Sequence, residues 1–312
     1  MPSAETGVDG HSVGPALCRL DEFLAQEYDY IVIGGGTAGL CVAARLTEND
    51  KVKVGVLEAG KNLMDDPQIS RPSLLSIIDR SNDYDGWASL GNKGEESTGW
   101  NPDAPVRIAD LTHTGWGWDE MVPYFKKHQT LDPPQKENPN KQFMPAATKE
   151  KYHGSNGPIH TSFNDYYEPF EYDFCEAAYA TVGGQRTLHD AWSGDHMGFY
   201  SSLAAVNRTD DPGKRSYSAT GYLRPNLHRP NLRVLTEALA GRILLENTTA
   251  SGVEFYHNGQ KHQIKTSGEI ILCGGVINSP QLLELSGIGD REVLKTAGVE
   301  CLVENDRVGA NF

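Results

Sequence analysis

The clearest pattern of apolar and polar positions lies between Tyr28 and Gly60. Tyr30–Ile33 is an apolar, β-branched run, which predicts a strand buried on both faces. Apolar residues then recur at helical spacing through "LCVAARLTEN", and "KVKVGVLEAG" predicts a second strand. A strand, a helix and another strand in this order predict a βαβ unit with parallel strands.

A second set of apolar runs follows residue 231 and predicts further strands and a helix. The expected strands are Leu232–Thr236, Arg242–Glu246, Ala250–Tyr256 and Glu269–Cys273. The expected helix is Ser279–Leu285, with Pro280 at its start. Asn258 and Gly259 together are typical of a hairpin turn. With another helix expected over Pro169–Val182, the pattern predicts an α/β fold with a doubly wound sheet.

The turn after the first predicted strand has the glycine spacing of a dinucleotide-binding fingerprint. Gly34 permits a tight turn, Gly36 lets the backbone approach a pyrophosphate, and Gly39 allows close packing of helix on strand. Amides at the following helix N-terminus face the anionic diphosphate. Glu58, at the carboxyl end of the second strand, is placed to accept hydrogen bonds from ribose hydroxyls.

The fingerprint alone leaves the choice of cofactor open between FAD and NAD. A carboxylate at Glu58 disfavours a ribose 2′-phosphate, so NADP fits less well. A glycine-rich turn without any ligand is the alternative interpretation of the same residues.

Composition narrows the classes of partner and compartment. The 312 residues carry a formal net charge of −14 with acidic residues spread along the chain, which excludes the basic face that nucleic acids require. The five cysteines have no metal-ligand spacing, so we expect buried thiols in a reducing compartment and no metal site. The chain lacks the features of a signal peptide and any run of membrane-spanning length, which predicts a cytoplasmic protein without a membrane partner.

Several stretches together resemble the glucose–methanol–choline (GMC) family of flavoprotein oxidoreductases. The stretches that carry this resemblance are "DYIVIGGGTAGLCVAARL", "NDYDGWASLGN", "GWGWDEMVPYFKKHQ", "YHGSNGPIHTSF", "SATGYLRPNLHRPNLRVLTEALAGRILLE" and "GVINSPQLLELSGIG". They occur in the order that the family has. Val276 departs from the small residue that is usual at its position.

The resemblance implies FAD as the cofactor and a small-molecule alcohol, oxidised at its CH–OH group, as the substrate. It implies a Rossmann-like FAD-binding domain and a substrate-binding domain that is incomplete in this sequence. The implied cofactor-binding residues are Gly34, Gly35, Gly36, Thr37, Ala38, Gly39, Glu58, Ala240, Gly274, Gly275, Asn278 and Ser279. Among them, Ala240 is expected to offer its backbone to the adenine, and Asn278–Ser279 to begin a helix at the cofactor.

Three departures from the family pattern lead us to expect an inactive or incomplete catalyst. Residues 69–81 lack the loop that lies along the flavin in the family, and residues 95–115 interrupt a family stretch like a retained intron or a surface insertion. The sequence ends where the family continues into the half that supplies its catalytic histidine. No catalytic residue can be assigned, because His113 lies in the insertion and seven further histidines have polar, loop-like surroundings that predict solvated side chains. These seven are His153, His160, His189, His196, His228, His257 and His262.

The resulting domain assignment has three parts. Residues 1–27 are expected to form a flexible or partly helical leader, 28–129 and 231–312 the FAD-binding domain, and 130–230 a partial substrate-domain region. Two functions remain open: an FAD-dependent oxidoreductase acting on an alcohol, and a non-catalytic, truncated product that at most binds flavin. The substrate, the electron acceptor and the oligomeric state are not determined by the sequence.

Overall fold

The computed structural model of the chain describes residues 14–72, 118–134, 149–164, 168–182, 192 and 203–310. These residues belong to two compact units. The first unit contains residues 14–64 and 218–310, and the second contains the described residues between 65 and 217.

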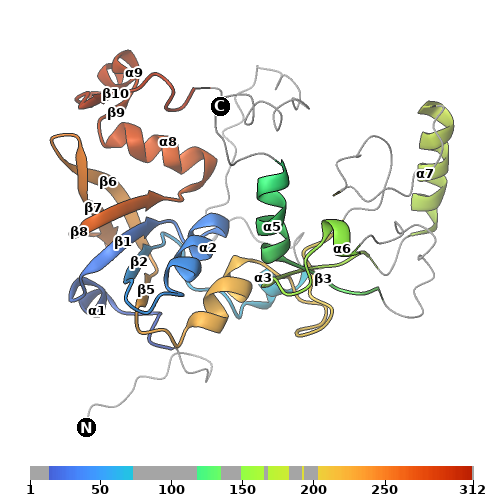
Figure 1. Cartoon of the computed structure of the whole chain (residues 1–312). Coiled ribbons are helices and arrows are strands. Elements are labelled where there is room, and N and C mark those ends of the chain that lie inside the picture. Colours follow the sequence, from blue (N-terminus) through green and yellow to red (C-terminus); the bar gives the residue numbers. More distant parts are fainter. Residues whose placement is uncertain are drawn as a thin grey trace, which may run out of the picture. The chain divides into compact units, whose positions relative to one another are not determined.

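A six-stranded mixed sheet with the order β5-β2-β1-β8-β7-β6 is the framework of the first unit (Figure 1). Its strands are β1 (Tyr28–Ile33), β2 (Val54–Leu57), β5 (Leu232–Leu235), β6 (Ala238–Glu246), β7 (Thr249–His257) and β8 (Gln260–Leu272). Its helices are α1 (Leu20–Leu24), α2 (Thr37–Leu46), the π-helix η4 (Ala219–Leu223), the 3-10 helix η5 (Arg224–Asn226), α8 (Gly275–Leu285) and α9 (Arg291–Thr296). A separate parallel pair joins β9 (Ile288–Gly289) to β10 (Val303–Glu304).

The central part of the sheet is parallel, as the βαβ pattern predicted. β1 pairs with β2 on one side and with β8 on the other, and β2 pairs in parallel with β5. All four residues of β2 are buried, which explains the continuous apolar run in the sequence. Burying one such Val or Leu side chain stabilises the fold by roughly 1.5–3 kcal/mol.

Strand β8 joins the parallel and the antiparallel parts of the sheet. Its first half forms an antiparallel hairpin with β7, and its second half pairs in parallel with β1. Asn258 (φ 51°) and Gly259 (φ 72°) make the predicted hairpin turn between β7 and β8. A register shift in the pairing with β1 lies beside Gly268, where any Cβ would collide with the carbonyl oxygen of Asp29. Because its first half pairs with β7, β8 extends over Gln260–Leu272 and is longer than the strand expected over Glu269–Cys273.

The two faces of the parallel strands pack against different elements. On one face, Gly39 of α2 lies directly over Val32, so α2 covers this side. On the other, Ile31 and Ile33 join a core cluster that includes Phe255 of β7 and Leu282 of α8. α2 and α8 therefore lie on opposite sides of β1, which is the doubly wound arrangement that the pattern predicted (Figure 1).

A buried carboxylate lies on the outer face of the antiparallel strands. Glu254 of β7 faces Arg242 at 3.3 Å, Lys261 at 3.4 Å and the side-chain amide of Gln263 at 3.4 Å, although its own side chain is only 7% exposed. Burial alone raises the pKa of the Glu254 carboxyl. The hydrogen bond from Gln263 and the charges of Arg242 and Lys261 outweigh burial, and the pKa is lowered.

The segment 14–27 before β1 was expected to be flexible or partly helical. It contains helix α1, as the second alternative has it, and it packs against the sheet instead of being flexible. Leu17 forms a parallel bridge with Val234 at the outer edge of β5, and Ala16 accepts a hydrogen bond from the Val234 amide at 2.7 Å. Phe23 of α1 is fully buried and stacks edge-on with Phe255. The backbone of this segment thus pairs with the outer edge of β5, which would otherwise be open.

Helix α8 begins four residues before the expected start at Ser279. Its N-cap is Gly274, so Pro280 lies inside the helix instead of at its start. Proline removes the hydrogen bond to the carbonyl four residues earlier, which belongs to Val276 in the exposed first turn. An exposed carbonyl can bond to water, and this explains why the helix tolerates Pro280.

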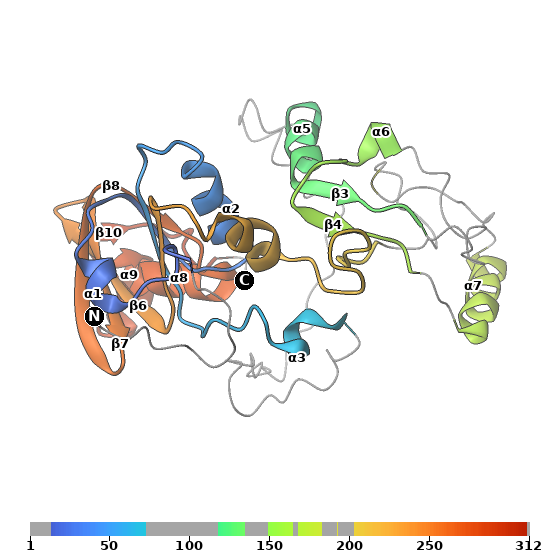
Figure 2. The ribbon, with the colours of Figure 1, turned by 90° about the horizontal axis from the view of Figure 1, so that it is seen from below.

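The second unit contains short elements, some of which the sequence pattern missed. These are α3 (Pro67–Ser70), α5 (Trp118–His128), β3 (Gln129–Leu131), α6 (Lys149–Tyr152), β4 (Ile159–Thr161) and α7 (Pro169–Val182). Only α7 was predicted, and its bounds are confirmed. β3 and β4 form a parallel pair (Figure 2) in segments for which the sequence pattern predicted no strand. Each is three residues long, too short for a periodic pattern.

A buried carboxylate organises the second unit. Asp132 is 1% exposed and accepts hydrogen bonds from the amide of Arg208 at 2.6 Å and from the hydroxyl of Thr209 at 3.3 Å. Its oxygen also lies 2.8 Å from Nδ1 of His160, whose Nε2 is 3.1 Å from Asp210. These contacts attach the segment around residue 208 to strand β4.

The boundaries between the two units differ from the domain limits expected at residues 129 and 230. The first unit ends at residue 64 and resumes at 218, because Tyr222 and Leu223 of η4 are buried with α2. The expected departures at 69–81 and 95–115 lie outside the described residues, apart from 69–72. The assignment of the second unit to a substrate domain stays a prediction. None of the described helices combines the length and apolarity needed to cross a bilayer.

Candidate dinucleotide site

The carboxyl ends of β1, β2 and β8 meet at one edge of the parallel sheet. Ile33 at the end of β1 is in register with Leu57 on one side and Leu272 on the other. The amide of Gly34 donates to the Leu57 carbonyl at 2.8 Å, and the amide of Cys273 donates to the Ile33 carbonyl at 2.8 Å. In doubly wound sheets, ligands bind at the edge where neighbouring strands lead to opposite faces.

Two helices begin at this edge, and neither has a side-chain cap. α2 starts after its N-cap residue Gly36, and α8 starts after its N-cap residue Gly274. Glycine has no side chain that could accept a hydrogen bond from the first amides of the helix. The first backbone amides of a helix have no acceptor within the helix, and they carry the positive end of its dipole. Two such ends beside adjacent strands make an environment suited to a diphosphate.

The three fingerprint glycines are required for three different reasons. Gly34 has φ 102°, and a Cβ there would collide with the carbonyl oxygen of Cys273. A Cβ at Gly39 would collide with the carbonyl oxygen of Gly34, so this glycine permits the close approach of α2 to β1. At Gly36, by contrast, no described atom lies within 4 Å of the Cβ position. Gly36 therefore leaves open space at the start of α2.

Glu58 follows β2 and turns its carboxylate toward the glycine turn. One carboxylate oxygen accepts the amide of Gly35 at 2.5 Å, and the other accepts the amide of Gly60 at 2.7 Å. Each carboxylate oxygen has a further lone pair. The half-buried carboxylate can thus accept hydrogen bonds from a diol while its position stays fixed by the backbone.

The turn between β5 and β6 holds the backbone of the Glu58 segment. The Glu58 amide donates to Leu235 at 2.9 Å, and its carbonyl accepts from Ala238 at 2.8 Å. The amide of Glu237 donates to the Gly60 carbonyl at 3.0 Å. Glu237 has φ 55°, and its carbonyl lies 3.1 Å from Nδ1 of His257. The sequence pattern did not indicate Glu237 or His257 as part of this edge.

The thiol at the end of β8 adds no negative charge to the edge. Burial, and to a smaller extent the neighbouring Cys41, raise the pKa of Cys273. The group is therefore a neutral thiol near pH 7. A thiolate at this place would repel a diphosphate, and the neutral form avoids that repulsion.

The structure brings most of the expected cofactor residues to one edge. Gly34 through Gly39, Glu58 and Gly274–Gly275 lie at the carboxyl ends of β1, β2 and β8. Ala240 lies in β6, two residues beyond the Ala238 amide that bonds to Glu58. Asn278 and Ser279 lie in the second turn of α8, not at its start. The amides nearest the helix start are those of Gly275, Val276 and Ile277.

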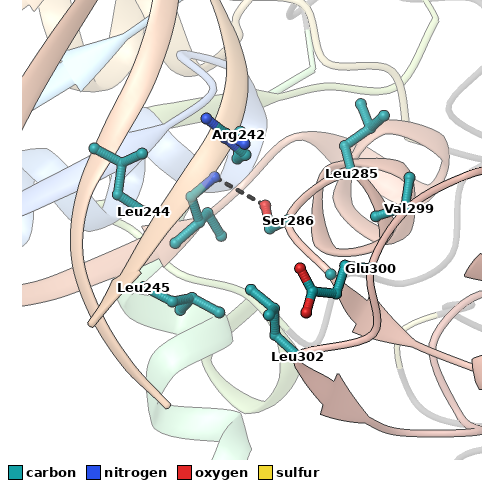
Figure 3. A pocket seen from close by; sticks show the side chains of 10 residues that line it. Arg242, Leu244, Leu245, Leu285, Ser286, Val299, Glu300 and Leu302 are labelled. Atoms are coloured by element: carbon teal, nitrogen blue, oxygen red, sulfur yellow. Dashed lines mark hydrogen bonds between the residues drawn. The ribbon is translucent and has the colours of Figure 1, made fainter. Parts of the chain in front are cut away.

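A cavity of about 330 Å³ lies elsewhere in the first unit (Figure 3). Its lining comes from β6, the C-terminal end of α8 and the chain before β10, with Leu244, Leu285 and Leu302 among its apolar side chains. The hydroxyl of Ser286 accepts the Ile243 amide at 2.8 Å at its rim. Since α8 has 11 residues, the cavity is about 15 Å from the helix N-terminus. It takes no part in the dinucleotide edge.

The described histidines differ in part from the solvated side chains expected. His153 is only 3% exposed, with Nδ1 3.2 Å from the side-chain oxygen of Gln129. His160 lies in β4 beside the buried Asp132, and His257 contacts the carbonyl of Glu237. His153 lies between α6 and β4, and β4 has only three residues, so neither segment has a periodic pattern that would predict a buried side chain. His113, His189 and His196 lie outside the described residues.

Two family models match the chain. Residues 109–312 match the model described as GMC oxidoreductase, and residues 29–85 match the model described as an FAD binding domain. The second match contains the glycine turn and Glu58, so it places an FAD-binding sequence at the dinucleotide edge. FAD is the cofactor that these matches indicate.

Curated relatives extend over nearly all of this chain. Dehydrogenase mpl7 of Monascus purpureus is 36% identical over 329 residues, which cover 95% of this chain and 51% of the relative. Mitochondrial choline dehydrogenase of Mus musculus is 30% identical over 343 residues, which cover 98% of this chain and 53% of the relative. The chain therefore spans about half the length of these relatives.

Solved structures with similar folds are also FAD enzymes or oxidases by description. An FAD-dependent oxidoreductase from Chaetomium thermophilum superposes with a TM-score of 0.76 at 27% identity, covering 90% of this chain and 51% of that chain. Pyridoxine 4-oxidase from Mesorbium loti superposes with a TM-score of 0.71 at 26% identity, covering 89% of this chain and 55% of that chain.

Proposed function

Because the chain belongs to the GMC oxidoreductase family, we propose that its first unit binds FAD for the oxidation of an alcohol at its CH–OH group. The observation that supports this most is the position of Glu58. Its carboxylate is held against the glycine turn by the amides of Gly35 and Gly60, beside two uncapped helix N-termini. This arrangement matches an adenosine diphosphate in both charge and hydrogen bonding.

Each part of the edge has a role in holding the cofactor. The amides at the start of α2 bind the diphosphate, and the open space at Gly36 lets a phosphate come close to the backbone. Glu58 accepts the ribose hydroxyls. The amides at the start of α8 lie at the end of the neighbouring strand and supply a second positive end. FAD, when bound, supplies the acceptor for the hydride of the alcohol.

The substrate class follows from the relatives and not from a described pocket. Choline and pyridoxine, named in the descriptions of two relatives, both carry a CH–OH group. We propose a small alcohol of this kind as the hydride donor for the whole protein. Small size and a primary hydroxyl are the features that choline and pyridoxine share.

A second candidate is a flavin-binding module without oxidase or dehydrogenase activity. The observation in its favour is that three described histidines already have polar partners within the protein. His153 contacts Gln129, His160 contacts Asp132, and His257 contacts a backbone carbonyl. Anaerobic bleaching of bound flavin by small alcohols separates the candidates: bleaching supports the oxidoreductase, and a stable oxidised spectrum supports the module.

Flavin retention by the 312-residue chain tests the proposal. The chain is incubated with FAD and desalted, and we expect a visible flavin absorption band to remain. Glu58→Gln removes the charge while keeping one acceptor oxygen. Hydrogen bonds to charged groups contribute about 1.5–3 kcal/mol each, so the dissociation constant for FAD should rise at least tenfold.

The matched control is Glu269→Gln, which removes an exposed carboxylate from β8 in the same sheet. It should retain FAD as the wild type does. Unfolding of the FAD-free proteins is measured in parallel, so that a loss of binding is not confused with a loss of fold. A wild-type chain that keeps its fold and retains no FAD would show the proposal to be wrong.

A further inference from the structure

A chain of hydrogen bonds leads from β7 to the ribose carboxylate. His257, the last residue of β7, contacts the carbonyl of Glu237 through Nδ1 at 3.1 Å. The Glu237 amide donates to the carbonyl of Gly60 at 3.0 Å, and the Gly60 amide donates to Glu58 at 2.7 Å. Glu58 in turn accepts the amide of Gly35 in the glycine turn. Every link in this series is a direct contact.

The middle of this series is a backbone conformation that glutamate does not favour. Glu237 has φ 55°, whereas the other described non-glycine residues with positive φ are Asn247 and Asn258, a residue type that tolerates this region. Such a conformation persists only when its surroundings hold it in place. Three contacts on the two peptide groups of Glu237 supply that hold. Its amide donates to Gly60, its carbonyl contacts His257, and the Ala238 amide of the same peptide group donates to the carbonyl of Glu58.

We propose that His257 is a positioning residue for the cofactor, which acts through the left-handed turn at Glu237 to fix Glu58 at the ribose. A carbonyl oxygen only accepts, so Nδ1 of His257 carries the proton in this contact. Without this donor, the peptide group after Glu237 keeps the bond from the Ala238 amide to Glu58 but loses the one at its carbonyl. The strained turn is then less firmly held, and the amide of Glu237 can move away from Gly60. The segment Glu58–Gly60 loses one of its supports, and the carboxylate is no longer held for the diol.

This inference rests on the proposed role of Glu58 in binding ribose, and the choice of ligands separates the two. ADP carries the ribose hydroxyls that Glu58 accepts, and 2′,3′-dideoxy-ADP lacks them while keeping the adenine and the diphosphate. In the wild-type chain, ADP should bind more tightly than the dideoxy analogue. A residue that acts only through Glu58 should change the affinity for ADP and leave that for the analogue unchanged.

The test measures both dissociation constants for four variants of the full chain. His257→Leu removes the donor at similar volume, and we expect ADP binding to weaken about fivefold, the value of one ordinary hydrogen bond. His257→Asn keeps a side-chain N–H near the position of Nδ1 and should bind ADP nearly as the wild type does. His262→Leu, on the neighbouring strand β8, is the matched control and should leave both constants unchanged.

The fourth variant tests the route through the turn. Glycine adopts positive φ without strain, so Glu237→Gly combined with His257→Leu should restore most of the ADP affinity. Equal weakening of ADP and dideoxy-ADP by His257→Leu, or failure of the added glycine to restore ADP binding, would overturn the positioning role. If the wild-type chain does not distinguish ADP from its dideoxy analogue, the ribose role of Glu58 fails and the inference fails with it.

Discussion

Replacing Gly36 with alanine should separate binding of the cofactor from stability of the fold. Gly36 is the N-cap of α2 with φ −83° and ψ −156°, a conformation that alanine can also adopt. No described atom lies within 4 Å of the new Cβ, so the fold itself does not resist it. The methyl group instead occupies the space through which a phosphate would approach the first amides of α2.

The two effects on stability are small and opposite. Changing glycine to alanine at a compatible backbone position stabilises by about 0.4–1 kcal/mol through the unfolded state. Alanine is a poorer N-cap than glycine by a similar amount. We therefore expect the free energy of unfolding of the FAD-free chain to change by less than about 0.5 kcal/mol. Losing one hydrogen bond to a phosphate costs about 1.5–3 kcal/mol, which raises the dissociation constant for FAD roughly 10- to 150-fold.

The contrast variant is Gly39→Ala, whose Cβ would collide with the carbonyl oxygen of Gly34. Overpacking of this kind typically costs about 1–3 kcal/mol of stability. Urea unfolding of the FAD-free proteins and titration of flavin fluorescence give the two quantities for each variant. Gly36→Ala with wild-type FAD affinity, or with the same loss of stability as Gly39→Ala, would refute the reasoning.

Three further predictions concern the fold. Glu254→Gln should destabilise the chain by about 1 kcal/mol at pH 7, measured by urea unfolding; the value is small because water partly screens the exposed charges of Arg242 and Lys261. The pKa of Glu254 is lowered in the folded state, so the difference between the two proteins should persist above the unfolded pKa of about 4.3 and vanish at lower pH. Asp132→Asn should destabilise the second unit by about 3 kcal/mol, seen as faster amide exchange there, because it removes a buried charge from its donors. Ser286→Ala should cost about 1–3 kcal/mol in urea unfolding by leaving the Ile243 amide without its acceptor, and an unchanged midpoint would contradict this.

The sequence pattern predicted the elements whose side chains alternate or recur over several turns. The βαβ unit, α7 and the hairpin at Asn258 follow directly from apolar spacing and turn residues. The first half of β8 escaped prediction because it is polar, "QKHQIKT", and is held by pairing with β7 instead of by burial. The early start of α8 escaped because Pro280 is usually a sign of the first helical turn.

The candidate site was predictable as far as its glycines and Glu58 are concerned. Their spacing is dictated by contacts that depend on local geometry, such as the space at Gly36 and the crowding at Gly39. Glu237 and His257 were not predictable, because they meet only after β6 and β7 have paired. No residue type in the β5–β6 turn indicates a left-handed conformation, since glutamate is not enriched there.

The pairing of β1 with β8 has a consequence for folding during synthesis on the ribosome. Tyr30 and Glu269, which are partners in this ladder, come from opposite ends of the sequence, and closing so long a loop is entropically costly and slow. β1, α2 and β2 are synthesised first, but their neighbour β8 emerges only late. The nascent chain thus contains the glycine fingerprint long before the N-terminus of α8 is synthesised and can pack next to it. Cofactor capture should accordingly be one of the last events of folding, and until then the open side of β1 is a surface for chaperones to protect.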